Sequence, residues 1–143
     1  MTLDKIISVA GKPGLFKVLS QAKGRLIVES LTNKKRFPIN AMNTISALGE
    51  IAIYTYDEEV PLREVFVTIH EKEKGKTSVK PNDNGTVLTK YFKEILPHFD
   101  DERVYTSNIK KLLKWYNELV AVNFDFENLK KEITASKQEA SKD

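Results

Sequence analysis

Basic side chains near the start of the chain are the residues best suited to chemistry. Lys12, Lys23 and Lys34 recur at intervals of eleven residues, each in a predicted turn between short strands. Because alternate turns of a small barrel emerge at the same end, we expect Lys12 and Lys34 to share one rim, with Arg36 nearby. Cations gathered in this way bind phosphates and release counterions. The pattern therefore predicts a phosphate-binding surface, to which Lys35 also contributes. The alternative is that these lysines only hydrate the turns.

Aromatic side chains that stack on bases often accompany such a surface. The candidates in this part of the chain are Phe16, Phe37, Tyr54 and Tyr56. The alternative for Phe16 and Phe37 is that they fill the core.

A second group of cations lies in the last third of the chain. Lys110, Lys111 and Lys114 fall on one side of a predicted helix, beside Trp115. A basic helix that begins at a capped N-terminus approaches a phosphate backbone with both its dipole and its side chains. The alternative is an ordinary amphipathic helix whose lysines lie in water.

No spacing in the sequence predicts catalysis or a metal site. The chain has no cysteine, and its histidines, His70 and His98, lie far apart and are expected to be surface polar residues. Runs of acidic residues lack the spacing of a calcium loop, and Pro81–Gly85 is expected to be a turn. No glycine-rich stretch matches a nucleotide-binding fingerprint. We therefore expect no catalytic residues, no metal and no cofactor.

Composition indicates a folded chain with an uneven distribution of charge. The 143 residues are 41% hydrophobic and 30% charged, with a net charge of +3. Residues 1–56 carry +5, residues 57–103 carry −3 and residues 104–143 carry +1. A basic first part predicts an anionic partner, with mutual attraction between the two parts as the alternative. The absence of cysteine, of a signal peptide and of a long apolar run predicts a cytoplasmic protein without membrane contact.

Short alternating segments in the first part predict a small β-barrel. They are Ile6–Val9, Leu15–Ser20, Arg25–Leu31, Arg36–Ile39 and Ile51–Tyr56. A tight turn is expected at Gly11–Gly14 and one helical turn around Asn43–Ala47. Five strands in this length favour closure, because a closed barrel has no exposed edges.

Helical periodicity replaces the alternation after a boundary at Asp57–Val60. One helix is predicted from Pro61 to about Gly75, and a second, from Val87 to Leu96, stops at Pro97. Thr106 or Ser107 is expected to cap the third helix. A short fourth helix spans Asp125–Ile133, and residues 134–143 are expected to be a disordered tail. The predicted domains are therefore residues 1–57 and 58–133.

Two stretches resemble a small family of uncharacterised bacterial proteins. The first is VAGKPGLFKV, residues 9–18, followed by IVESL, residues 27–31. The second is VYTSNIKKLL, residues 104–113, followed by Trp115 and Tyr116. Together they extend over most of residues 3–126, and this resemblance implies no catalytic residue. More distantly, Gly11, Gly14 and Val18 are similar to the glycine and valine pattern of KOW and SH3-like barrels in ribosomal and transcription proteins. The later helices resemble helix-extension-helix modules found beside nucleic-acid binders.

These observations predict an α+β protein, with a five-stranded SH3-like barrel followed by a three- or four-helix unit. The predicted function is non-catalytic binding of DNA or RNA, mainly through the phosphate backbone. The predicted contact residues are Lys12, Lys34, Lys35, Arg36, Lys110, Lys111 and Lys114. The alternative is a protein-interaction or scaffold module that uses an aromatic groove of the barrel.

Overall fold

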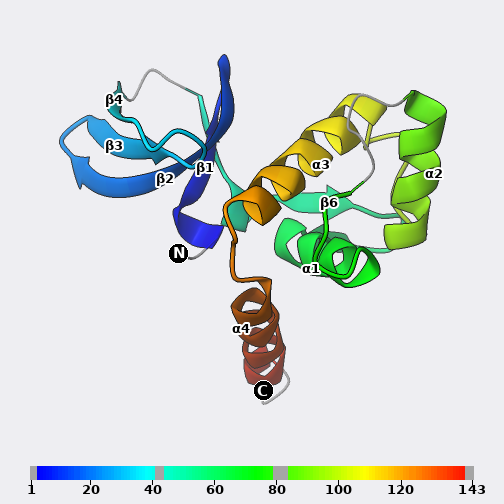
Figure 1. Ribbon diagram of the computed structural model, residues 1–143. Helices are drawn as coiled ribbons and strands as arrows, with labels where there is room; N and C mark the ends of the chain where they lie inside the picture. Colours follow the sequence, from blue (N-terminus) through cyan, green and yellow to red (C-terminus); the bar gives the residue numbers. More distant parts are fainter. Residues whose placement is uncertain (1–2, 41–43, 79–83, 141–143) are drawn as a thin grey trace. The chain divides into compact units, whose positions relative to one another are not determined.

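The computed structural model describes residues 3–40, 44–78 and 84–140 (Figure 1). The chain forms two compact units, Met1–Ile51 and Ala52–Asp143. We name them the sheet unit and the helical unit and describe each by itself. The division precedes the predicted boundary at Asp57–Val60, because the strand that follows Ile51 pairs within the helical unit.

An antiparallel sheet forms the body of the sheet unit (Figure 1). Its elements are η1 (Leu3–Lys5), β1 (Ile6–Val9), β2 (Lys12–Ala22), β3 (Arg25–Ser30), β4 (Arg36–Asn40), β5 (Ile45–Ala47) and η2 (Leu48–Glu50). The strand order is β4-β3-β2-β1-β5. Gly11 and Gly24 occupy the two tight connections with φ of +82° and +69°, a region that glycine enters without strain. The predicted turn at Gly11–Gly14 is shorter than expected, since β2 already begins at Lys12.

Alternation of side chains along the strands places one apolar set on a single face. Ile7, Val9, Phe16, Val28 and Ile39 form this buried cluster. Phe37 packs edge-on against Phe16, with ring centroids 5.3 Å apart. Because strand side chains alternate between faces, the neighbouring residues point the other way, and among these Ile6 and Leu15 are also fully buried.

The predicted α+β class is confirmed, but in place of the predicted five-stranded SH3-like barrel the chain forms an open five-stranded antiparallel sheet. Among the described residues, β4 and β5 are edge strands that do not pair with each other, so the barrel does not close. The fifth strand is Ile45–Ala47, where a helical turn was expected around Asn43–Ala47; Asn43 itself lies outside the described residues. The predicted strand Ile51–Tyr56 instead belongs to the helical unit, because its central residues pair with a later segment.

Four helices follow a short hairpin in the helical unit. The hairpin consists of β6 (Ala52–Tyr54) and β7 (Glu59–Pro61). The helices are α1 (Leu62–Lys72), α2 (Gly85–Ile95), α3 (Thr106–Ala121) and α4 (Phe126–Ala140). Helix α1 packs against α4 and α2, and α2 packs against α3. The core is aromatic: Phe66, Phe92 and Tyr116 are fully buried.

The helix ends explain two departures from expectation. Neither Thr106 nor Ser107 caps α3; instead the side chain of Asn108 accepts a hydrogen bond from the backbone N–H of Tyr105 (2.9 Å). Helix α4 continues to Ala140 although residues 134–143 were expected to be disordered. This stretch is rich in Ala, Lys, Glu and Gln, which are good helix formers, so a helix anchored by Leu129 extends through it. Residues 141–143 lie outside the described residues.

Candidate functional site

The predicted cations of the sheet unit lie at the same end of the sheet. Lys12 begins β2 directly after the β1–β2 connection, and Lys34 and Lys35 lie in the β3–β4 connection. In an antiparallel meander these two connections share one end, whereas the β2–β3 connection lies at the other. All three lysines are exposed. We name Lys12, Lys34, Lys35 and Arg36 the cationic end of the sheet.

Lys12 reaches across the sheet to the strand that carries Arg36. Its Nζ lies 4.9 Å from the centroid of the Phe37 ring, close enough for a cation–π interaction. This contact links the β1–β2 connection to the start of β4. It also covers Phe37, and Phe16 is only 4% exposed, so neither ring is available for base stacking.

The β3–β4 connection presents its lysines from a well-defined turn. Lys34 has a φ of +65°, and its backbone N–H donates to the carbonyl of Ser30 (3.0 Å). The backbone N–H of Lys35 donates to Asn33 Oδ1 (2.9 Å). These backbone hydrogen bonds fix the turn, and both lysine side chains are exposed.

Arg36 differs from the three lysines because it has a carboxylate partner. Its Nε lies 2.9 Å from Glu29 Oε2, across the β3–β4 pair. Glu29 also lies opposite Lys17 in the β2–β3 register, but its ion pair is with Arg36. Within the described residues of the sheet unit, this is the single ion pair, and Lys12, Lys34 and Lys35 have no carboxylate within pairing distance.

The predicted lysines of α3 lie in the helical unit. Lys111 and Lys114 are exposed and Lys110 is half-buried, while the apolar side of the helix carries Ile109, Leu113 and Tyr116. Lys111 Nζ lies 5.9 Å from the ring centroid of the half-buried Trp115. Helical geometry places Lys110 and Lys114 one above the other. They form a basic stripe within this unit.

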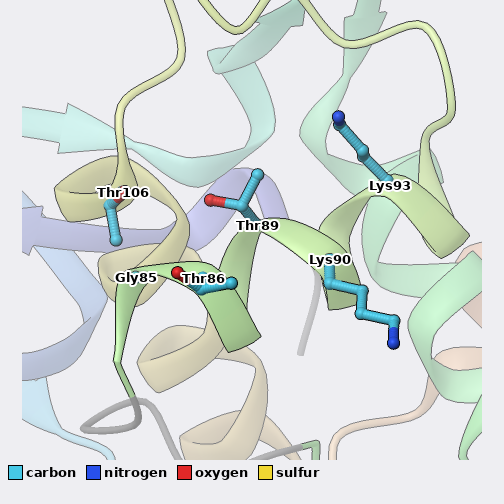
Figure 2. Close-up of a pocket in the computed structure, with 6 residues that line it drawn as sticks. All are labelled: Gly85, Thr86, Thr89, Lys90, Lys93 and Thr106. Carbon is cyan, nitrogen blue, oxygen red and sulfur yellow. The ribbon is translucent and has the colours of Figure 1, made fainter.

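A wide, shallow hollow lies between α2 and the start of α3 (Figure 2). It encloses about 600 Å³ and is lined by Gly85, Thr86, Thr89, Lys90, Lys93 and Thr106. The two helices approach closely here, since a Cβ on Gly85 would lie 3.3 Å from Thr106 Cγ2. In Figure 2, Lys90 and Lys93 point in opposite directions, so their charges do not converge on one ligand.

The histidines have structural surroundings. His70 is half-buried and stacks on Phe126, with ring centroids 4.4 Å apart and an angle of 17° between the rings, whereas His98 is exposed. His70 is therefore a packing residue and not the free surface residue that we expected. Among the described residues, no group of His, Asp or Glu is placed to hold a metal ion. Pro81–Asp83, part of the expected turn at Pro81–Gly85, lies outside the described residues; Asn84 caps α2 by accepting from the Val87 N–H (3.0 Å).

Burial shifts the pKa values of two core tyrosines. Burial, reinforced by Glu73, raises the pKa of Tyr116 to about 12, and the same two causes raise the pKa of Tyr91 further. The Tyr116 hydroxyl donates to the carbonyl of Lys76 (2.7 Å), whereas the buried Tyr91 hydroxyl has no hydrogen-bond partner among the described residues. Both groups are neutral phenols at pH 7.

Tyr54 and Tyr56, which the sequence suggested as base-stacking residues of the first part, instead belong to the helical unit, on a surface that also carries carboxylates. Tyr54, Tyr56 and Tyr105 are 42%, 61% and 63% exposed; the Tyr56 hydroxyl donates to Asp101, and Tyr54 contacts Arg103, which pairs with Asp100. Tyr54 and Tyr105 lie 51 positions apart in the sequence, so no local pattern groups the three tyrosines. In the sequence, the acidic residues next to these tyrosines were the available sign of a charged surface.

No helix among the described residues is long and apolar enough to cross a bilayer.

Comparison with known proteins reproduces the two-part organisation. Residues 3–48 match the family described as Domain of unknown function (DUF5606), and residues 51–119 match Domain of unknown function (DUF6852). These matches lie on the two sides of the structural division at Ile51. No curated protein matches the chain.

A solved structure is similar to nearly the whole chain. It is the solution NMR structure of a structural genomics target from Bacteroides vulgatus, with 43% sequence identity and a TM-score of 0.69. The similarity covers 87% of this chain and 89% of that one. The chain therefore belongs to the same uncharacterised family as that protein, a family of unknown function whose two parts here match DUF5606 and DUF6852.

Proposed function

We propose that the protein binds nucleic acid without catalysis, through phosphate contacts made by the cationic end of the sheet. The observation that carries this proposal is the exposure of Lys12, Lys34 and Lys35 at one end of the sheet without carboxylate partners among the described residues. Lysines without a carboxylate partner release counterions when they contact phosphates, and this release supplies most of the affinity in non-specific binding.

Arg36 makes a smaller contribution in this proposal. Its guanidinium is already paired with Glu29, but its side chain is 68% exposed. An exposed pair of this kind is weak, so a phosphate can compete for the guanidinium. The lysine stripe of α3 (Lys110, Lys111 and Lys114) is the proposed second contact.

Binding of this type involves contacts with the phosphate backbone of the nucleic acid and not with its bases. Phe16 is buried and Phe37 lies under Lys12, so the sheet unit offers neither ring as a stacking platform. We therefore expect little sequence preference and similar affinity for single and double strands. The same covered rings argue against the alternative of a scaffold module with an aromatic groove.

We also infer a distant relationship between the sheet unit and SH3-like barrels. The meander of four strands with a fifth beside β1 supports it, together with the irregular pairing at Val18 and Ser20, which bends β2.

Fluorescence anisotropy with labelled single-stranded DNA, duplex DNA and RNA at several salt concentrations tests the proposal. The triple variant K12Q/K34Q/K35Q is expected to weaken binding by roughly tenfold or more and to lower the salt slope by about 2 to 3. K5Q/K23Q/R25Q is the matched control, because it removes three exposed charges from the opposite end of the sheet. Equal losses in the two variants would reject the cationic end as the site, and no binding by the unaltered protein at low salt would reject the function.

A further inference from the structure

The exposed tyrosines of the helical unit lie where two distant segments meet. The backbone N–H of Asp100 donates to the carbonyl of Tyr54 (2.9 Å), and that of Tyr56 donates to the carbonyl of His98 (2.9 Å). Thr55 and Phe99 form a β-bridge between these contacts. The segments 54–59 and 98–105 are thus held together by main-chain hydrogen bonds, and we name their exposed face the tyrosine surface.

Charge on the tyrosine surface is strongly negative. Its two segments carry six carboxylates, Asp57, Glu58, Glu59, Asp100, Asp101 and Glu102, and one cation, Arg103. Among the described residues, Asp57, Glu58, Glu59 and Glu102 have no ion-pair partner. The surface therefore attracts a cationic ligand and repels nucleic acid.

Arg103 shows how this surface holds a guanidinium. Its Cζ lies 5.3 Å from the centroid of the Tyr54 ring, and its Nε lies 3.5 Å from Asp100 Oδ2. One cation therefore receives both a cation–π contact and a carboxylate. The protein's own side chain occupies this position.

Tyr56 repeats the arrangement without an internal cation. Its hydroxyl donates to Asp101 Oδ1, which raises the pKa of Tyr56 and fixes the ring beside the carboxylate. The Tyr56 side chain is 61% exposed. Exposed tyrosines with few rotamers are typical anchors of protein interfaces.

We propose that the tyrosine surface binds a basic segment of a partner protein, with an arginine or lysine side chain over Tyr56 and against Asp101. Charge complementarity selects this occupant, and the contacts of Arg103 supply the geometry. The tyrosine surface belongs to the helical unit and the cationic end to the sheet unit, so this proposal does not depend on the function proposed above.

Anisotropy with the full chain and two labelled peptides of equal length tests this, one alternating Arg with Ser and the other alternating Glu with Ser. The Arg peptide is expected to bind more tightly than the Glu peptide. The Y56A substitution is expected to lower the affinity for the Arg peptide by roughly tenfold. The D101N substitution removes the charge of the carboxylate but leaves the Tyr56 ring in place. It is expected to lower the affinity for the Arg peptide by roughly threefold to tenfold. Equal binding of the two peptides, or an unchanged affinity in both variants, would overturn the proposal.

Two control variants separate the surface from general effects. V87A removes another exposed apolar side chain and E127Q another exposed carboxylate, both within the helical unit and outside the surface. Neither is expected to change the affinity for the Arg peptide. Sedimentation of the unaltered protein tests whether a second copy of this chain occupies the surface. If the protein self-associates, Y56A abolishes the self-association and the Arg peptide does not bind, then the occupant is another copy of this chain and the proposed partner protein is rejected.

Discussion

The sheet unit and the helical unit differ in how they use charged side chains. The sheet unit carries eight basic and three acidic residues, and its single described ion pair is Arg36 with Glu29. The helical unit carries fifteen basic and seventeen acidic residues. Its described ion pairs are Lys72–Glu94, Arg103–Asp100 and Lys130–Glu71. Two of these pairs join different helices, so charge in this unit supports its own packing, whereas most cations of the sheet unit remain available to an external anion.

The hydrophobic cores of the two units also differ. The sheet unit has a small apolar cluster on one face of an open sheet, centred on Phe16 and Val28. The helical unit has an aromatic core in which Phe92 packs edge-on against Phe99 (4.9 Å) and Tyr116 contacts Phe126 (5.6 Å). From these cores we expect the helical unit to be the more stable of the two, and the sheet unit carries the proposed binding surface. Changes in the two cores test this.

The largest effect is expected from the aromatic core. Phe92→Ala should lower the free energy of unfolding of the helical unit by about 3–5 kcal/mol, because it removes a fully buried ring. Urea unfolding followed by the fluorescence of Trp115 reports on this unit. Phe16→Ala, the matched change in the sheet unit, should move the Trp115 transition less. An equal shift would show that the two units unfold as one, and the comparison would fail.

A smaller effect is expected from alkaline pH. Tyr116 has a pKa raised from 10 to about 12, so the folded state favours its neutral form. The resulting stability is fully present below pH 10 and is lost as pH rises toward 12, a loss of about 2–3 kcal/mol. The free energy of unfolding measured between pH 9 and 12 should fall less steeply in Y116F. Identical pH profiles for Y116F and the unaltered protein would contradict this assignment.

The smallest effect distinguishes two tyrosine hydroxyls in the same core. Y116F should cost about 1 kcal/mol at pH 7, since the hydroxyl donates to Lys76. Y91F should be nearly neutral or slightly stabilising, because the Tyr91 hydroxyl is buried without a described partner. Thermal unfolding of the two variants measures the difference. A larger loss in Y91F would reveal a partner for that hydroxyl and would make the two positions equivalent.

Much of the local structure followed from spacing. Alternation in Arg25–Leu31 and Arg36–Ile39 predicted β3 and β4, and the periodic apolar residues from Leu62 predicted α1. Errors occurred where a short segment depended on its partner. Ile45–Ala47 is a strand because β1 offers it an edge, and Ala52–Tyr54 leaves the sheet because β7 pairs with it.

In the candidate site, too, some features followed from the sequence and others depended on contacts between distant residues. Spacing placed Lys12 and Lys34 at one end of a sheet, because connections alternate between ends in any antiparallel meander. It did not reveal that Arg36 is paired with Glu29, that Phe37 lies under Lys12, or that Tyr54 and Tyr56 meet Asp100 and Asp101.

By itself the sequence determined the order of the first four strands and of the four helices, the change from period 2 to period 3.6, and the excess of positive charge in the first part. These properties depend on residues close together in the chain. Only the tertiary structure decided whether the sheet closes, which cations have partners and which tyrosines share a surface. Those outcomes depend on contacts between residues far apart in sequence, and local periodicity carries no information about them.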